Sequence, residues 1–380
     1  MSWRETTRME ERKEFVVLAQ MPGAQRRELC RRFGISPQTG YKWLARAQAG
    51  GADWAQDRSR RPHRSPARLE GAPVEAILAV RAAHPAWGAR KIGAVLTRDG
   101  LSVPAVSTIH AALVRHGRIA ADPRASGAAP GRFEHAAPNL MWQMDFKGWV
   151  VLGDGQRCHP LTAIDDHSRY LLCLSACADQ RRESVQPRLE AMFRRYGLPG
   201  ALLVDNGTPW GDGPNRAWTR LGVWLLKLDV ELVHSRPYHP QTRGKNERLH
   251  RTLNAELLAR VRLRDLADAQ RHFDRWRPVY NTVRPHEALG QQVPASRYVP
   301  SARAMPDRLP QIEYPPGEVL RTVGTTKAYI SYRGRLWNVP GAFAGERVAI
   351  RPVERDGRFG VFFGARRIAN IDLNEHTANG

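Results

Sequence analysis

Three acidic residues occupy positions from which their carboxylates could act together. Asp145 lies in a segment that alternates apolar and polar residues, Asp205 directly follows the apolar run 201–204, and Glu247 opens a run of helix-forming residues. Successive members of this set are 60 and 42 residues apart. Hard divalent cations such as Mg²⁺ prefer carboxylate and phosphate oxygens, and two such ions can assist an in-line displacement at phosphorus. The set therefore suggests metal-dependent chemistry on a phosphodiester.

Glu247 and two further acids also have ordinary explanations when each is considered alone. Glu247 would be a solvated charge on a surface helix, among neighbouring cations that keep it ionised. Asp165 and Asp166 precede a Ser-Arg turn and are interpreted as turn and core-edge residues, with an auxiliary catalytic role as the alternative. What favours a shared site is the predicted position of each carboxylate on its element.

The elements around the three acids can be predicted from apolar periodicity. Residues 142–147 alternate in the manner of a half-buried strand with Asp145 on its polar face, and residues 201–204 form a continuous apolar strand. Asp205 then stands at the carboxyl end of a strand, where open α/β sheets bind ligands. In the helix from residue 246, the stripe of Leu249, Leu253 and Leu257 faces the core, and Glu247 points about 200° away from Leu249.

The charge balance indicates what such a site would act on. The chain of 380 residues carries 59 Lys and Arg against 37 Asp and Glu, a net charge of +22 with a pI near 10.8. Residues 1–140 hold half of this excess, so a simple basic tail is excluded. A field of this size suits a polyanion, because Lys and Arg release counterions from phosphates. Cys30, Cys158, Cys173 and Cys177 are too scattered for a disulfide framework and are predicted to be reduced core residues.

Residues 1–50 are typical of a helix-turn-helix domain. Three helical segments are separated by short turns, and Ser36 and Pro37 supply an N-cap and a first-turn proline for the last of them. The second helix of this motif enters the major groove of DNA, although an ordinary three-helix packing unit would have the same pattern. The outward residues predicted to contact DNA are Gln38, Thr39, Lys42 and Arg46.

A second helical unit follows a basic linker. In the linker, residues 51–70, Arg60 and Arg61 could lie in a minor groove or simply be solvated. Residues 71–118 repeat the logic of the first unit and are predicted to form a second helix-turn-helix or winged-helix domain, followed by a linker at residues 119–138. The outward residues of its last helix are Ser107, Thr108 and His110.

The order of four motifs resembles the DDE transposases of the retroviral-integrase superfamily. These motifs are Trp142–Phe146, Asp165–Arg169, Val204–Gly207 and His239–Arg248. Within the superfamily the chain is most similar to the four-eighty-one insertion-sequence family, whose pattern the segment Asn281–Gly290 also fits. The 41 residues between Asp205 and Glu247 exceed the usual spacing, and the excess is expected in the Gly- and Pro-rich stretch 208–218.

The resemblance implies both a fold and a reaction. The fold is a ribonuclease-H-like α/β core at residues 139–300, in which Asp145, Asp205 and Glu247 hold two Mg²⁺ (or Mn²⁺) ions. The reaction is that of a transposase, which binds the terminal inverted repeats of double-stranded DNA, exposes a 3′-OH at each end and joins it to target DNA. Synapsis of two ends requires at least a homodimer. Cations beside Glu247 would contact the DNA backbone, namely Arg243, Lys245 and Arg248.

Two other functions and the rest of the chain complete the expectations. A DNA-binding regulator with an inactive core would lack one of the acids, and a ribonuclease-H-type nuclease would not need two DNA-binding units.

Residues 317–373 alternate in short segments with Gly turns and are predicted to form a small β-barrel. The sequence has no apolar run of about 18 residues, so we expect no transmembrane helix and no membrane partner. The resemblance implies a bacterial cytoplasmic, nucleoid-associated protein.

Overall fold

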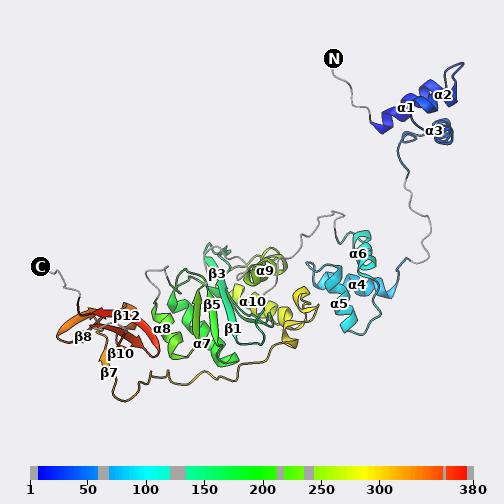
Figure 1. Cartoon of the computed structure of the whole chain (residues 1–380). Helices are drawn as coiled ribbons and strands as arrows, with labels where there is room; N and C mark the ends of the chain where they lie inside the picture. Colours follow the sequence, from blue (N-terminus) through cyan, green and yellow to red (C-terminus); the bar gives the residue numbers. More distant parts are fainter. Residues whose placement is uncertain are drawn as a thin grey trace. The chain divides into compact units, whose positions relative to one another are not determined.

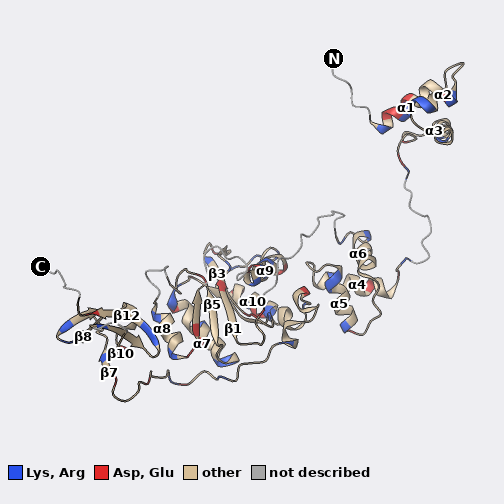
Figure 2. Ribbon diagram, viewed as in Figure 1, with Lys and Arg blue, Asp and Glu red and all other residues tan. Residues whose placement is uncertain are grey.

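The computed structural model describes residues 7–58, 68–119, 134–211, 218–234, 244–353 and 357–374 (Figure 1). The chain divides into two compact units, Met1–Arg68 and Leu69–Gly380, and each unit is described by itself. Figure 2 shows that Lys and Arg are distributed over the helices and strands of both units, as the spread of charge along the sequence predicts. Among the described residues, none of the helices combines the length and apolar character that a membrane span requires.

The first unit is the predicted bundle of three helices. They are α1 (Arg8–Ala19), α2 (Arg26–Arg32) and α3 (Pro37–Ala49). Ser36 caps α3 by accepting a 3.2 Å hydrogen bond from the backbone N–H of Thr39. Gly40 of α3 permits the close approach of the helices, because a Cβ there would lie 2.6 Å from Sγ of Cys30 and 2.8 Å from the ring of Phe15.

The second unit begins with another bundle of three helices, which matches the predicted segments. These are α4 (Ala72–Ala83), α5 (Ala89–Arg98) and α6 (Val106–Arg115). Ile77, Ile92, Ile109 and Leu113 are completely buried between them. The apolar positions of α6 therefore face inward, as its sequence pattern predicts.

A mixed sheet of six strands forms the middle of the second unit. The strands are β1 (Met141–Phe146), β2 (Val150–Val151), β3 (Arg157–Asp165), β4 (Leu171–Cys177), β5 (Ala201–Val204) and β6 (Glu231–His234). Strand β1 pairs antiparallel with β3 and parallel with β5, which pairs parallel with β6, while β4 pairs antiparallel with β3. The order β4-β3-β1-β5-β6 is that of the ribonuclease-H-like fold, so the expected core is confirmed.

Helices cover both faces of this sheet. On one face, α7 (Arg182–Tyr196) and α8 (Arg220–Lys227) pack against Trp142, Met144 and Val204. On the other face, α9 (Gly244–Leu253), η2 (Asn254–Leu258) and α10 (Leu266–Thr282) pack against Ile164 and Leu174. The helix predicted from residue 246 to 260 thus exists, but its second part is a π-helix, a form often found at functional sites. Two short 3₁₀ turns follow, η3 (Glu287–Leu289) and η4 (Pro294–Ser296).

The C-terminal strands form two separate sheets, and the predicted β-barrel is wrong in this detail. The larger sheet has the order β12 (Arg366–Asp372), β11 (Arg358–Phe363), β10 (Arg347–Pro352) and β7 (Val319–Thr322). The smaller contains only β8 (Tyr329–Tyr332) and β9 (Arg335–Asn338). Arg333 and Gly334 both have positive φ angles, of 51° and 74°, so a tight turn pairs these two strands with each other. Strands β12 and β7 are the edges of the larger sheet, so among the described strands the ladders do not close into a barrel.

Candidate active site

The register of two parallel strands brings the first two acids to the same edge of the sheet. Met141, Trp142 and Gln143 of β1 pair with Ala201, Leu202 and Leu203 of β5, an interval of 60 residues. Asp145 and Asp205 are separated by the same 60 residues. Asp145 is the second-last residue of β1 and Asp205 directly follows β5, so both acids lie at the carboxyl ends of parallel, neighbouring strands. The predicted carboxyl edge of the sheet thus carries both half-buried carboxylates.

Asp145 also faces the side of the sheet that carries α9. Successive side chains of a strand point to opposite faces. Trp142 and Met144 pack with α7 and α8, so Gln143 and Asp145 point toward the face covered by α9 and α10. The prediction that Asp145 lies on a polar face is therefore only partly right, because Gln143 on the same face is 3% exposed.

Helix α9 presents Glu247 in its first turn, away from its apolar stripe. Leu249, Leu253 and Leu257 are buried in the cluster beneath α9 and α10, as predicted from their spacing. Glu247 is exposed, in agreement with its predicted direction. The leucines fix the rotation of the helix about its axis, and this rotation sets the direction in which Glu247 points.

A histidine that sequence reasoning did not single out connects α9 to the backbone of Asp145. Nε2 of His250 lies 2.9 Å from Oγ1 of Thr162, and this hydroxyl donates a 2.9 Å hydrogen bond to the carbonyl oxygen of Asp145. Because the single hydroxyl hydrogen of Thr162 is used in this way, Nε2 of His250 must carry the proton of the other bond. His250 follows Glu247 by three residues, so the helical spacing of these two residues was the available signal.

The pKa of His250 gives a testable pH dependence. Burial, assisted by the nearby charge of Lys147, lowers the pKa of His250 from 6.5 to about 4. Between these two values the unfolded chain binds a proton that the folded protein does not. The free energy of unfolding should therefore be pH-independent in this respect above 6.5 and fall as pH drops toward 4, by on the order of 3 kcal/mol in all. NMR titration of the imidazole, with chemical shifts typical of the Nε2–H tautomer, measures this directly.

The control for this prediction is a change that keeps the hydrogen bond but removes the titration. In His250→Gln the side-chain amide can still donate to Thr162, so part of the acid sensitivity between pH 6.5 and 4 should disappear. His116→Gln, at an exposed position, should leave the pH profile unchanged. A His250 that titrates near 6.5 would contradict the buried contact.

Asp205 is oriented by the short turn that follows β5. Its Oδ1 accepts a 3.2 Å hydrogen bond from the backbone N–H of Gly207, and its carbonyl oxygen lies 3.1 Å from Nδ1 of His234 on β6. A Cβ at Gly207 would lie 3.2 Å from Oδ2 of Asp205, so glycine keeps this side of the carboxylate open. The Asp-Asn-Gly motif thus acts as a local device that holds one carboxylate at the edge of the sheet.

The types of side chain in this set suit a hard divalent cation. Asp145 and Asp205 offer carboxylates at the ends of neighbouring strands, the ligand type that Mg²⁺ and Mn²⁺ prefer. Within the described part of the chain, no group of three or more His, Cys, Asp or Glu side chains is arranged to hold a metal ion. The assignment of Asp145, Asp205 and Glu247 as one metal site therefore stays a prediction.

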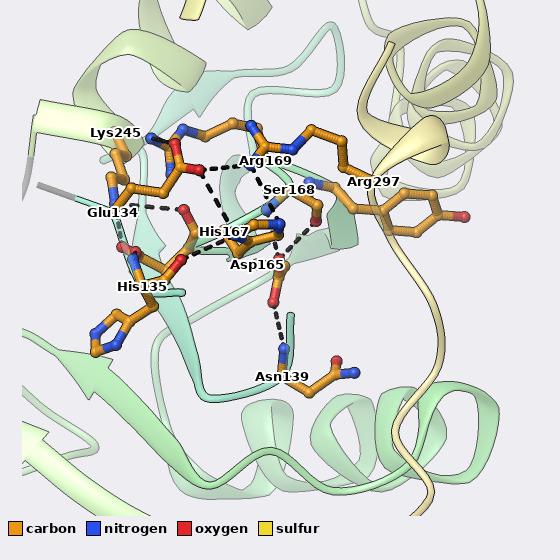
Figure 3. Close-up of polar contacts among 11 residues, drawn as sticks. Glu134, His135, Asn139, Asp165, His167, Ser168, Arg169, Lys245 and Arg297 are labelled. Atoms are coloured by element: carbon orange, nitrogen blue, oxygen red, sulfur yellow. Dashed lines mark hydrogen bonds and ion pairs between the residues drawn. The ribbon is translucent and has the colours of Figure 1, made fainter. Parts of the chain in front are cut away.

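The motif Asp165–Arg169 forms a buried polar network beside the site (Figure 3). Oδ1 of Asp165 accepts hydrogen bonds from the backbone N–H and the hydroxyl of Ser168, at 2.7 and 2.6 Å, and Oδ2 accepts one from the backbone N–H of Asn139 at 2.8 Å. Asp165, Asp166 and Ser168 are all at most 1% exposed. The interpretation of the two aspartates as turn and core-edge residues agrees with this burial.

A second set of contacts in the same network connects the segment before the core to the C-terminal end of the core. Glu134 accepts hydrogen bonds from Arg169 at 3.2 Å and from Arg297 at 2.8 Å (Figure 3). Nε2 of His167 lies 3.2 Å from the guanidinium of Arg297. Nδ1 of His167 is 2.8 Å from the carbonyl oxygen of His135. The network therefore joins residues that are more than 100 positions apart in the sequence.

The predicted DNA contacts have different environments. On α3, Gln38 and Lys42 are exposed, whereas Thr39 and Arg46 are half-buried, and on α6 Ser107 and His110 are exposed and Thr108 is half-buried. Arg60, Arg61 and Arg243 lie outside the described residues. Beside Glu247, the exposed Arg248 donates a 3.1 Å hydrogen bond to Glu287, and Lys245 is paired with the buried Asp166.

Comparison with protein families gives five matches along the chain. Two models described as "Integrase core domain" match residues 135–240 and 228–294, and "IS481 family transposase, C-terminal domain" matches residues 319–379. A "Helix-turn-helix domain" matches residues 11–63, and a "Homeodomain-like domain" matches residues 39–113.

Individual proteins are similar over part of their length. The chain is 29% identical over 158 residues to a 39.2 kDa protein of insertion element IS476 of Xanthomonas euvesicatoria, covering 42% of this chain and 44% of that protein. It is 28% identical over 171 residues to a 31.7 kDa protein of insertion element IS407 of Burkholderia multivorans, covering 45% and 59%. The chain thus spans about half the length of these curated relatives.

A solved structure and the family matches complete the comparison. A chain in the intasome of simian T-cell lymphotropic virus in complex with PP2A regulatory subunit B56 gamma is 14% identical, with a TM-score of 0.37 over 78% of this chain and 99% of that chain. The integrase core matches coincide with the ribonuclease-H-like sheet and its helices, and the IS481 match with the C-terminal strands. The chain is thus similar to IS481 family transposases in its C-terminal domain and to integrase core domains in its central sheet.

Proposed function

We propose that the protein is a DDE transposase that cleaves the ends of an insertion sequence and joins each 3′-OH to target DNA. The observation that supports this proposal is the parallel pairing of β1 and β5, because Asp145 and Asp205 then stand at the carboxyl ends of neighbouring strands. A polynucleotidyl transferase needs acidic ligands at a point where a polyanionic substrate is held by cations. The net charge of +22 supplies those cations.

The divalent ions belong to this proposal. Asp145, Asp205 and Glu247 would hold two Mg²⁺ or Mn²⁺ ions, which when bound supply charge stabilisation for the attacking and leaving oxygens of a phosphodiester. The protein contributes the alignment of the two strands and the orientation of α9. Synapsis of two element ends would require at least two copies of the chain.

The two helical units would recognise the DNA sequence at the ends of the element. Three cations of the first unit gather around Trp43, with Arg12, Arg46 and Lys42 centred 4.2, 4.8 and 5.5 Å from its ring. Lys42 is also exposed on α3, the helix predicted to enter the major groove. We propose that this helix and α6 recognise the terminal inverted repeats.

Lys42→Ala tests the role of α3. If Lys42 neutralises a phosphate, its loss should weaken binding to end DNA and reduce the slope of log K against log salt by about 1. Fluorescence anisotropy of a labelled end at several salt concentrations measures both quantities. Lys13→Ala removes an exposed lysine of α1 and should leave the slope unchanged. Equal effects of the two variants would argue for a diffuse field rather than a contact at α3.

The experiment that tests the function is an assay of joining. The purified protein is incubated with Mg²⁺, a labelled duplex that carries the inverted repeat flanking the gene, and a supercoiled plasmid. A transposase produces label covalently attached to the plasmid. A ribonuclease-H-type nuclease would cut the duplex without joining it to the plasmid. An inactive regulator would bind the duplex without cutting it. Either of these two results would reject the proposal.

A further inference from the structure

The carboxylate of Asp166 is bonded from three directions in the interior of the second unit. Its Oδ1 accepts a 2.6 Å hydrogen bond from Nε2 of Gln143 and pairs with the ammonium of Lys245, and its Oδ2 accepts a 2.9 Å bond from the backbone N–H of His135. Lys245 also donates a 3.3 Å hydrogen bond to the carbonyl oxygen of Asp166. Figure 3 shows Lys245 reaching into this polar network from the start of α9.

Two side chains that bind Asp166 each lie two residues before a proposed metal ligand. Gln143 precedes Asp145 by two residues on β1, and Lys245 precedes Glu247 by two residues on α9. One carboxylate oxygen therefore joins the strand that carries the first acid to the helix turn that carries the third. We propose that Lys245 and Asp166 form a brace that positions Glu247 relative to Asp145, so that Lys245 serves the reaction as a positioning residue and not as a contact to DNA.

The burial of the pair shows that it is part of the structure and not a loose surface contact. The side chain of Asp166 is 1% exposed and that of Lys245 is 14% exposed. Burial alone would raise the pKa of Asp166, but the hydrogen bonds from Lys245 and from the backbone of His135 outweigh it and lower the pKa. Asp166 is thus ionised at neutral pH, and removal of one partner of such a pair leaves an uncompensated buried charge.

The same contacts argue against a phosphate as the partner of Lys245. Its ammonium already donates to two oxygens of Asp166, and a phosphodiester would have to compete with a buried carboxylate at hydrogen-bond distance. Arg248, one residue beyond Glu247, is in contrast 64% exposed. The predicted DNA contacts beside Glu247 are thereby divided: Arg248 remains a candidate, and Lys245 takes a different role.

The brace would hold the first turn of α9, which the leucine stripe does not hold against the sheet. Leu249 and Leu253 hold the middle and end of α9 against the sheet, whereas Glu247 lies in the first turn. Helix termini fray unless they are tied down, and a displacement of about 1 Å at a reacting centre can cost a factor of about 10² in rate. An ion pair at the second residue of α9 supplies the missing constraint.

The brace rests on the proposed function, and its test uses variants of the full chain that differ in one contact each. Lys245→Met removes the ammonium at similar length, and Lys245→Met with Asp166→Asn removes both charges, so that no uncompensated buried charge remains. Lys227→Met is the matched control, because Lys227 at the end of α8 is 16% exposed and pairs with Glu346 at 2.6 Å. Readouts are Mn²⁺ binding by electron paramagnetic resonance without DNA, hydrogen exchange of α9, end-DNA affinity with its salt slope, and cleavage rate at increasing Mg²⁺.

The positioning role predicts a specific pattern. In both the single and the double variant, Mn²⁺ affinity and cleavage should fall 10–100-fold, as for other groups that orient metal ligands, and the first turn of α9 should exchange faster. End-DNA affinity and salt slope should equal those of the unchanged protein and of Lys227→Met. The double variant should regain thermal stability relative to Lys245→Met without regaining metal affinity, a separation that a merely structural ion pair would not produce.

Three results would overturn the brace. A salt slope reduced by about 1 with unchanged Mn²⁺ affinity would make Lys245 a DNA contact. Full activity of the stable double variant would make the pair structural only. If Lys245→Met behaves like the unchanged protein while Glu247→Gln is inactive, the brace is rejected and the proposed function is kept. If Glu247→Gln is itself active, the assignment of Glu247 to the metal site is rejected.

Discussion

Replacing Asp145, Asp205 or Glu247 by its isosteric amide is expected to abolish strand cleavage while the protein still binds end DNA. Each amide keeps the size of the side chain but removes the negative charge that a divalent ion requires. The cleavage rate should fall by on the order of 10²–10³ or more, because the electrostatic groups of an active site are worth this much singly. Cleavage of a labelled inverted-repeat duplex and gel-shift binding of the same duplex measure the two properties.

Asp154→Asn is the matched control for the three amides. Asp154 is an exposed acid in the turn between β2 and β3, where its carboxylate accepts a hydrogen bond from the backbone of Gln156. The same change of charge at this position should leave cleavage within experimental error. Retention of cleavage in any one of the three site variants would remove that residue from the metal site, and loss of DNA binding in all three would mean that they act through the fold.

Leu253→Ala is expected to cost about 2–5 kcal/mol of stability, the usual cost of a large-to-small change in a packed core. Leu253 is 0% exposed and lies in the cluster that joins α9 and α10 to the sheet. The cavity left by the change cannot be filled by water and loses the contacts of the missing atoms. Hydrogen exchange of the α10 and β4 amides, which belong to the same packed layer, reports the loss as a free energy.

An exposed leucine provides the comparison for Leu253. Leu336 on β9 is 71% exposed, so Leu336→Ala should change stability by no more than about 0.5 kcal/mol. A cost below about 1 kcal/mol for Leu253→Ala would contradict the packing of α9 on the sheet. It would also weaken the argument that the leucine stripe sets the direction of Glu247.

Local signals in the sequence determined many of the elements and the residues that they carry. Ser36 and Pro37 set the start of α3, because the capping hydrogen bond and the fixed φ of proline act within one turn. The spacing of Leu249, Leu253 and Leu257 determined which side of α9 is buried, since burial of one face follows directly from a helical repeat. The residue motifs also predict the three acids of the proposed metal site without any knowledge of strand pairing.

The tertiary structure alone decided how these elements meet. The parallel register of β1 and β5, the bond of Thr162 to His250 and the pairing of Lys245 with Asp166 join residues between 60 and 88 positions apart. Periodicity describes the exposure of a residue but not its partner, because a partner depends on which surfaces pack together. For the same reason, alternating C-terminal segments could not distinguish a closed barrel from a sheet and a hairpin. The strand pairing decided it, because β7 and β12 are the edges of one sheet and β8 pairs only with β9 among the described strands.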